Sequence, residues 1–392
     1  MELWRKNLYG LWVAQFLSTA GLNMVIPFLP MFLRELGVTG DASIRLWSGL
    51  VFAAPFLVSA VMQPFWGVLG DRVGRKPMVL RAMLSLSLAN FLMGFSQSAV
   101  QLLLFRFFQG CLSGFLAPSL ALMTSCAPPE KTGYALGTLQ TSLITGLIAG
   151  PLLGGVLAHF MGSRLVFFWT GFFCLCGALI VFRFVLEEFD SGRKEQKSGL
   201  RQNLGSVFNS VELRKMFFVL ILIQFAINFI VPFLTLYVEF LKVPQDYLSL
   251  VSGAVFGVTG ITSAVTAPLW GRKADETGYY RVLRFAIVGM VVFMLPQAFV
   301  ANAVQLLLLR AGLGIFVSGT IPVIYSIIRQ STREEARGGI YGIFQSGILL
   351  GNMIGPLAGG GLAALLGLRN VFLASGFILC FALLSGIVQD KK

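Results

Sequence analysis

The chain has 392 residues, of which 56% are hydrophobic and only 12% are charged, and its mean hydropathy is +0.81. Soluble domains contain about 45–50% apolar and about 25% charged residues, so this composition excludes an ordinary soluble enzyme and a disordered scaffold. The formal net charge is +13, but the basic residues lie between long apolar runs and do not cluster on one soluble face. The sequence therefore predicts a membrane protein that has no nucleic-acid partner.

Twelve apolar runs are long enough to cross a bilayer, which takes about 20 residues in a helix. In chain order they lie at 8–33, 46–69, 78–95, 100–123, 133–159, 164–186, 216–240, 248–270, 282–300, 304–328, 340–366 and 371–388. On the side that holds both termini the loops contain 23 Lys and Arg, against five on the opposite side. The positive-inside rule therefore predicts an all-α, multi-pass membrane protein with both termini in the cytoplasm.

The loop between the second and third spans reads GVLGDRVGRK. Glycines permit a close backbone approach, an aspartate can face the N-terminus of a neighbouring helix, and basic side chains can bind carboxylates or lipid phosphates. We interpret this loop as a conformational latch between helices, formed by Gly67, Asp71, Arg72, Gly74, Arg75 and Lys76. The alternative is an ordinary tight turn that carries cytoplasmic positive charges.

The fourth span contains a charged residue, Arg106. Burial of an arginine in a membrane costs about 2.5–3.5 kcal/mol on insertion scales unless its side chain faces protein or water. Gln109 follows one helical turn later and can share the same face. We therefore place both residues in a polar interior cavity. The alternative is that the Arg106 side chain snorkels towards a helix end.

The fifth span contains the run TGLIAGPLLGG. Gly146, Gly150 and Gly154 recur every four residues, so they leave a flat stripe on which another helix can pack closely. Gly155 widens this stripe, and Pro151 adds a bend. The eleventh span has a matching pattern, which leaves open that the stripe is a packing device used in both halves of the chain.

The second half of the chain repeats the first after 204 or 205 residues. Asp71 falls on Asp275, and the run QLLLFR that ends at Arg106 falls on QLLLLR, which ends at Arg310. The second loop, GRKADETGYYR, keeps the aspartate but has Glu276 where an arginine would follow, so it predicts a weaker latch. One duplicated unit of six spans explains these matches.

The repeat also predicts the domain organisation. We expect two pseudo-symmetric six-helix bundles, at 1–187 and 214–392, joined by a charged cytoplasmic linker at 188–213. Because six is an even number, both bundles keep the same orientation across the membrane.

Amide side chains inside the spans are paired by the same repeat: Asn23 matches Asn228, and Gln140 matches Gln345. Such amides among abundant Phe and Met suit an amphipathic or lipophilic ligand, held by apolar contacts and a few polar anchors. The alternative for each amide is a hydrogen bond between helices.

The loop motif, the run LLLFRFFQG and the glycine stripe resemble motifs A, B and C of the major facilitator superfamily. Residues 47–67, 133–142 and 164–168 are similar to its bacterial twelve-span drug:proton antiporters, and the resemblance covers nearly the whole chain. It implies a substrate site near mid-membrane between the two halves, alternating access, and a location in the bacterial inner membrane. It also implies that the motif A latch stabilises the outward-open state and that the motif B arginine faces the cavity.

The acidic residues do not indicate how such a protein is coupled to protons. All 17 lie in loops or at the ends of spans, whereas proton relays usually place a carboxylate within the membrane. The proton carriers that we favour are Glu35, just after the first span, and Asp71 in the latch. Facilitated diffusion without proton coupling remains an alternative.

The resemblance implies a secondary active transporter that exports amphipathic or lipophilic small molecules in exchange for protons, as a monomer surrounded by membrane lipid. One alternative is a lipid or glycolipid flippase, and another is an importer or uniporter of an anionic metabolite; Arg106 and Arg310 favour both. A membrane enzyme is the weakest alternative, because the sequence has no HExxH run and no metal-ligand cluster. We therefore expect neither a metal ion nor a cofactor.

Overall fold

The computed structural model describes residues 2–187, 200–332 and 337–384, apart from the side chains at positions 64, 68, 71, 129, 200–202, 337 and 338. Every regular element in these residues is an α-helix or a short 3-10 helix. A helix bonds its backbone N–H and C=O groups internally, which is what an apolar chain needs in a lipid environment. The predicted all-α fold is confirmed.

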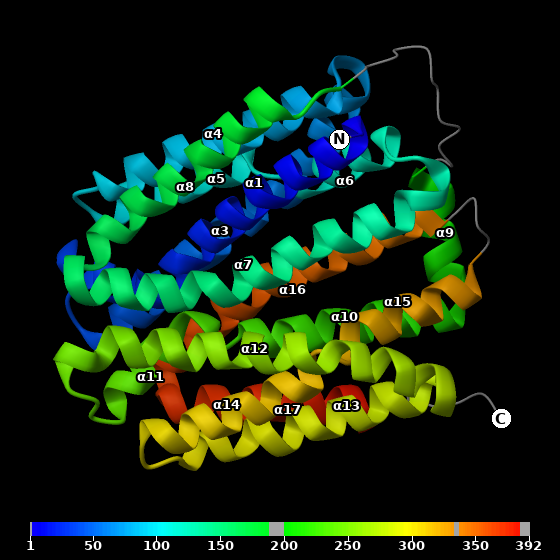
Figure 1. Ribbon diagram of the computed structural model, residues 1–392. Coiled ribbons are helices and arrows are strands. Elements are labelled where there is room, and N and C mark those ends of the chain that lie inside the picture. Colours follow the sequence, from blue (N-terminus) through cyan, green and yellow to red (C-terminus); the bar gives the residue numbers. More distant parts are fainter. Residues whose placement is uncertain (1, 188–199, 333–336, 385–392) are drawn as a thin grey trace. The chain divides into compact units, whose positions relative to one another are not determined.

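Figure 1 labels the α-helices, which are numbered in chain order. They are α1 (Leu3–Val25), α2 (Leu29–Glu35), α3 (Asp41–Val73), α4 (Arg75–Gly94), α5 (Ala99–Leu112), α6 (Leu116–Cys126), α7 (Thr132–Met161), α8 (Ser163–Phe184), α9 (Leu200–Asn209), α10 (Val211–Asn228), α11 (Leu234–Phe240), α12 (Gln245–Thr277), α13 (Tyr279–Met294), α14 (Ala303–Val317), α15 (Thr320–Ser331), α16 (Arg337–Leu366) and α17 (Leu368–Leu384). The 3-10 helices are η1 (Ile26–Phe28), η2 (Pro129–Lys131), η3 (Val231–Phe233) and η4 (Leu295–Phe299).

The helices account for the predicted spans. Among the described residues, 11 helical segments are long and apolar enough to cross a membrane. The twelfth predicted span, at 371–388, corresponds to the apolar helix α17, and its last residues, 385–388, lie outside the described chain. The first and seventh spans are interrupted by η1 and η3, which contain Pro27 and Pro232. Proline lacks the N–H that would continue the helical hydrogen bonds, so the breaks occur at matching places in both repeats.

The chain forms two compact units. Unit 1 consists of Met1–Gly40, Ala54–Lys194 and Pro244–Gly257, and unit 2 consists of Asp41–Ala53, Glu195–Val243 and Val258–Lys392. The first part of α3 thus belongs to unit 2, and the first part of α12 belongs to unit 1. The predicted boundaries at 187 and 214 stay a prediction. The described part of the predicted linker, 200–213, contains α9, and its last residues begin α10.

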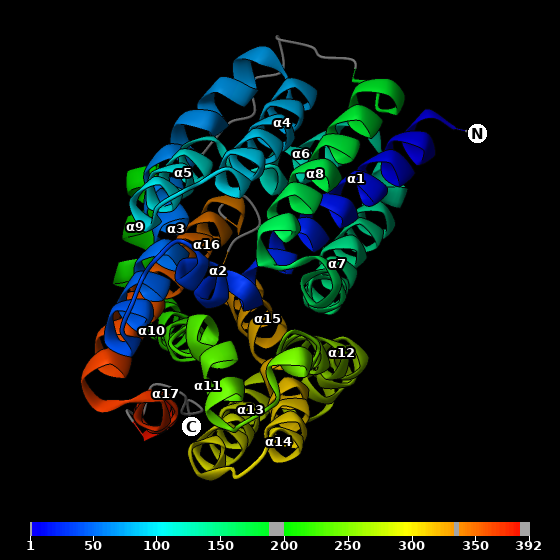
Figure 2. The same cartoon turned by 90° about the vertical axis from the view of Figure 1, so that its left-hand side faces the viewer.

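In unit 1, α1 packs against α7 and α8, and α8 also packs against α4 (Figure 2). Small residues allow this close approach. The Thr170 hydroxyl on α8 donates a hydrogen bond to the backbone oxygen of Gly21 on α1, at 2.7 Å. The core between these helices is apolar and includes fully buried Leu8, Leu11 and Val181.

In unit 2, α10 packs against α16 and α17, and α13 packs against α14 and α17. The hydrogen bonds of unit 1 recur here at the positions that the repeat predicts. Ser375 donates to the backbone oxygen of Ala226 at 2.7 Å, as Thr170 does to Gly21. The internal repeat found in the sequence is therefore also a repeat of tertiary contacts.

Candidate functional site

Arg106 lies on the buried face of α5 in unit 1. The helix is amphipathic: Leu104 on the opposite face is 58% exposed, whereas the Arg106 side chain is 8% exposed and Gln109 is 5% exposed. One guanidinium nitrogen of Arg106 donates to Oε1 of Gln109 at 3.0 Å, and Nε has no hydrogen-bond partner. The structure thus brings these two predicted residues together inside the protein, one helical turn apart.

Arg310 has the matching place in unit 2 and is 5% exposed. Its guanidinium carbon lies 5.9 Å from the ring centroid of Phe372 on α17, which is within the range of a cation–π contact. Its Nε and one terminal nitrogen are buried without a hydrogen-bond partner among the described residues. A buried guanidinium with unsatisfied donors is costly in apolar surroundings.

The predicted amides occupy different surroundings. Asn228 on α10 donates to Oδ1 of Asn352 on α16 at 2.8 Å, so it joins two helices of unit 2. Asn23 donates to the backbone oxygen of Thr19 on its own helix, at 2.8 Å. Gln140 and Gln345 are exposed within their units. The helix-to-helix alternative therefore describes Asn228 best, while the two glutamines are accessible.

Two aromatic side chains of α1, which the sequence analysis did not select, lie near α7 at the residue that follows Gln140. Next to Gln140 on α7, the Thr141 hydroxyl accepts a hydrogen bond from the indole N–H of Trp12 at 2.9 Å. The rings of Trp12 and Phe16 stack at 5.6 Å, one turn apart on α1. The i, i+4 spacing of these two rings was visible in the sequence, but apolar rings in a span resemble core or lipid-facing residues.

A similar cluster lies in unit 2. The rings of Tyr325 on α15 and Tyr341 on α16 meet edge to face at 5.2 Å, and the Tyr325 hydroxyl lies 3.5 Å from Oε1 of Gln345. Each unit thus has an aromatic cluster with hydroxyl and amide groups beside it. Rings with a few polar anchors suit amphipathic ligands.

The latch loop is held by a residue that the sequence analysis missed. Between α3 and α4, Gly74 has a φ of +105°, which favours glycine. The carboxylate of Glu187, just after α8, accepts hydrogen bonds from the backbone N–H groups of Arg75 and Lys76 at 2.7 and 2.8 Å. A negative charge at a helix N-terminus is favourable, so Glu187 caps α4.

The segment that carries Glu187 is itself fixed. The buried amide of Asn7 on α1 donates to the backbone oxygen of Leu186 at 2.7 Å and accepts from its N–H at 2.9 Å. The ammonium group of Lys76 also donates to the backbone oxygen of Phe182 at 3.2 Å. The chain after α8 is therefore attached to both α1 and α4.

The remaining latch residues lie in different surroundings. Gly67 has open space where a β-carbon would stand, and Arg72 is exposed. The side chain of Asp71 lies outside the described part of the structure. In the second copy, Asp275 accepts a hydrogen bond from the Tyr279 hydroxyl at 2.6 Å. The role of these residues as a latch stays a prediction.

The glycine stripe of α7 lies against α1. A β-carbon at Gly150 would stand 2.6 Å from the backbone oxygen of Ala20, and Gly146 and Gly154 also face α1. Gly155 faces the first part of α12, which belongs to unit 1, and Pro151 lies within α7. In unit 2 the matching glycines of α16 lie against α10 in the same way. Both repeats thus use the stripe for packing, which does not distinguish export from import.

Glu35 ends α2 and is exposed within unit 1. The Ser163 hydroxyl at the start of α8 donates a hydrogen bond to its carboxylate. This bond joins the end of α2 to the start of α8, where a negative charge is favourable.

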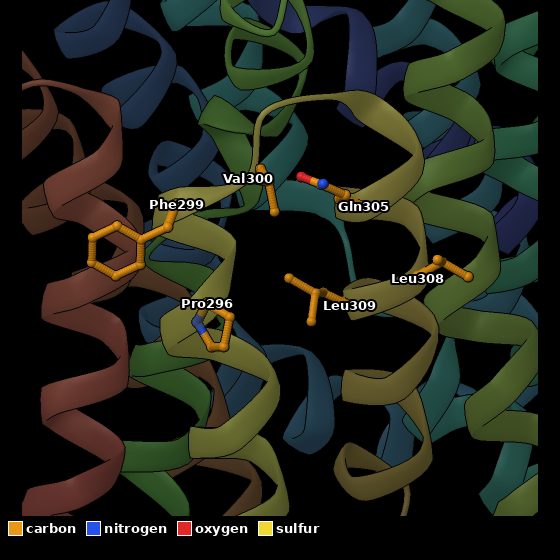
Figure 3. A pocket seen from close by; sticks show the side chains of 6 residues that line it. All are labelled: Pro296, Phe299, Val300, Gln305, Leu308 and Leu309. Atoms are coloured by element: carbon orange, nitrogen blue, oxygen red, sulfur yellow. The ribbon is translucent and has the colours of Figure 1, made fainter.

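A hollow of about 320 Å³ in unit 2 is not the predicted site. Figure 3 shows it between η4 and α14, lined by Pro296, Phe299, Val300, Gln305, Leu308 and Leu309. Its one amide, Gln305, accepts a hydrogen bond from the backbone N–H of Ala301 and so caps the start of α14. None of the predicted cavity residues lines this hollow.

Comparisons with known proteins agree with the resemblance seen in the sequence. Residues 11–296 and 248–390 match a family model described as Major Facilitator Superfamily. The multidrug resistance protein MdtG of Salmonella arizonae is 36% identical over 378 residues, which cover 96% of this chain and 94% of MdtG. The MdtG protein of Salmonella typhimurium has the same identity and coverage.

Solved structures show the same fold at low sequence identity. The nucleoside transporter NupG aligns with a TM-score of 0.81 at 12% identity, covering 98% of this chain and all of NupG. A bacterial homologue of the human lysosomal transporter Spinster aligns with a TM-score of 0.78 at 14% identity, covering 96% of this chain and 94% of the homologue. The human organic anion transporter MFSD10 aligns with a TM-score of 0.73 at 17% identity, covering 99% of this chain and all of MFSD10.

Proposed function

Because the chain belongs to the major facilitator superfamily, we propose that it is a multidrug exporter that moves amphipathic or lipophilic small molecules by alternating access. The observation that carries this proposal is the 36% identity to MdtG over 96% of the chain. The predicted location is the bacterial inner membrane, with both termini in the cytoplasm and the chain working as a monomer.

Partly exposed aromatic side chains in both units support such substrates. Unit 1 presents Trp12 and Phe16 beside the Thr141 hydroxyl, and unit 2 presents Tyr325 beside Gln345. Rings bind apolar bodies with little loss of rotamer entropy, and hydroxyl and amide groups bind polar substituents without demanding one charge. Surfaces of this kind favour broad over narrow substrate selection.

Proton coupling depends on accessible carboxylates. No Asp or Glu among the residues whose side chains are described is buried. Glu35 and Asp71 are the proton carriers that we propose: the first is exposed beside Ser163, and the second belongs to the latch loop. Each is predicted to bind a proton in one conformation and release it in the other.

A second candidate function is transport of an anion, including a lipid with a phosphate group. The observation that favours it is the pair of buried arginines, Arg106 and Arg310, whose Nε atoms have no hydrogen-bond partner in the described chain. An anionic substrate would supply the acceptors that these groups lack.

Accumulation assays in bacteria that lack their own drug exporters test the proposal. Cells expressing the chain are expected to retain less of a cationic or neutral amphipathic dye than cells expressing Arg106→Ala, at equal amounts of membrane-inserted protein. Gln305→Ala is a control outside the predicted site. Equal dye retention by wild type and Arg106→Ala contradicts a role for Arg106 in dye export, and faster loss of an anionic dye alone favours the second candidate.

A further inference from the structure

Unit 2 contains a second and larger groove, which none of the predicted cavity residues lines. It is formed by the second part of α12 together with α13 and α14 (Figure 1) and has a volume of about 560 Å³. This volume is within the range of about 300–1,000 Å³ that is typical of small-molecule sites.

The walls of the groove are largely apolar. Trp270 lies in the wall, and its indole N–H donates to the backbone oxygen of Ile315 at 2.6 Å, which fixes the ring. The Phe285 ring lies 6.0 Å from the Trp270 ring. Leu269 is 59% exposed and Phe285 is 61% exposed within the unit, so the groove opens onto an apolar surface. Acyl chains cover such a surface in a membrane protein.

Polar groups gather at one end of the groove, where α12 ends and α13 begins. This end is lined by Lys273, Thr277 and Arg281, and no carboxylate lines the groove. Lys273 pairs with Glu276 at 3.7 Å, but both side chains are more than half exposed. An exposed pair of this kind contributes little, so it competes weakly with another anion.

The internal repeat indicates that these charges are not required by the fold. At the shift of 204 residues, Lys273 falls on Leu69, and Arg281 falls on Pro77. The first copy therefore has apolar residues at both positions, although the Trp66 indole N–H donates to the backbone oxygen of Cys111 just as Trp270 donates to Ile315. The cations of the second copy need another explanation.

The two copies also differ in what lies over the tryptophan ring. In unit 1 the guanidinium carbon of Arg81 lies 3.6 Å from the ring centroid of Trp66, and Arg81 donates to the backbone oxygen of Ser113 at 3.3 Å. The matching residue in unit 2 is Phe285, so no cation covers Trp270 from that position. The second copy thus has an apolar wall with two cations at its end.

We propose that this groove binds one anionic phospholipid, whose phosphate lies between Lys273 and Arg281 and whose acyl chain runs along Trp270 and Phe285. Ammonium and guanidinium groups bind phosphate through charge-assisted hydrogen bonds, whereas the Thr277 hydroxyl at this end already donates to the backbone oxygen of Lys273 at 2.7 Å. The cations lie at the end of the span on the Lys- and Arg-rich side of the chain, the predicted cytoplasmic side, where anionic lipids attract basic residues. The site retains lipid from the surrounding membrane and is separate from the predicted substrate site.

Trp270 provides a direct test, because bromine atoms on an acyl chain quench indole fluorescence only at contact. The full chain is purified in detergent and titrated with phosphatidylglycerol or phosphatidylcholine carrying brominated chains. The sequence has six tryptophans, so the signal of Trp270 is taken as the difference between wild type and Trp270→Phe. Two cations are expected to make phosphatidylglycerol about 10- to 30-fold more effective than phosphatidylcholine at quenching Trp270.

In the double variant Lys273→Gln, Arg281→Gln, the two lipids are expected to quench Trp270 equally. A matched control, Lys6→Gln with Lys131→Gln, removes the same charge from exposed positions in unit 1 and is expected to keep the preference. Inorganic phosphate at millimolar concentration is expected to change nothing, because it lacks the acyl chain. Competition by phosphate alone would assign the site to free phosphate and overturn the lipid proposal.

Equal quenching of wild-type Trp270 by the two lipids overturns the proposal. The same preference in the double variant as in the charge-matched control also overturns it. If the double variant is not monodisperse in gel filtration, the wild type is titrated at rising salt instead. A preference for phosphatidylglycerol that survives 1 M salt contradicts recognition by exposed cations, since the Debye length is then about 3 Å.

Discussion

Glu187→Gln is expected to loosen the start of α4. The carboxylate accepts two backbone N–H groups, from Arg75 and Lys76, at 2.7 and 2.8 Å. Glutamine has one carbonyl oxygen, so it replaces at most one of these bonds as a neutral acceptor and removes the charge that faces the helix dipole. Charge-assisted bonds contribute about 1.5–3 kcal/mol and neutral ones about 0.5–1.5 kcal/mol. Because Glu187 is half-buried, we expect a loss of about 1–2 kcal/mol in the free energy of local opening.

Hydrogen exchange measures this loss directly. A change of about 1–2 kcal/mol corresponds to backbone amide exchange that is about 5- to 30-fold faster in the first turns of α4. Glu130→Gln, at an exposed position in η2, removes the same charge without a cap and is expected to leave α4 unchanged. Unchanged exchange in α4 of Glu187→Gln, or faster exchange spread evenly over α1 and α8, would refute the capping argument.

Four further substitutions, one of them with a matched control, separate packing, polar and latch roles. Arg310→Met removes a buried cation that has unpartnered nitrogens, so the thermal unfolding midpoint is expected to stay or rise while transport falls. Gly150→Val places carbon atoms against the backbone of α1 and is expected to destabilise unit 1 by about 1–3 kcal/mol, whereas Gly361→Ala meets open space and is expected to be tolerated. Asn228→Ala removes a hydrogen bond between helices, with an expected loss of about 0.6–1.7 kcal/mol in unfolding free energy. Asp71→Asn is expected to insert normally and to lower turnover.

Unfolding midpoints in detergent and transport by reconstituted protein check these four expectations. A marked fall in midpoint for Arg310→Met would mean that the guanidinium makes a stabilising contact. Equal unfolding midpoints for Gly150→Val and Gly361→Ala would contradict the argument that the glycine stripe is needed for close helix packing. Normal turnover of Asp71→Asn would remove that residue from the latch.

The fold was predictable because its causes are local. Long apolar runs form helices in lipid whatever their neighbours are, and a duplicated gene leaves matching residues such as Arg106 and Arg310. The cost of burying a guanidinium predicted an inward-facing Arg106, and helical spacing predicted that Gln109 shares its face. These inferences need only the composition, the helical periodicity and the internal repeat of the sequence.

The rest depends on contacts between distant parts of the sequence. Glu187 and Arg75 are separated by 112 residues, and Asn228 and Asn352 by 124. No periodicity links such pairs, so the cap of α4 was missed. For Asn228 the sequence left both a cavity and a hydrogen bond between helices open, and the structure shows such a hydrogen bond. Trp12 was missed because an apolar ring in a span resembles a core or lipid-facing residue, and because the hydroxyl that it contacts, Thr141, lies on another helix.

Flux into proteoliposomes tests proton-coupled export most directly. Vesicles containing the purified chain are loaded at one pH and diluted to another, and the movement of an amphipathic dye is followed with the pH gradient present and after an ionophore collapses it. The gradient is expected to drive dye against its own concentration gradient, and collapse is expected to end that accumulation. Dye movement at the same rate and to the same extent without the gradient would contradict proton-coupled transport.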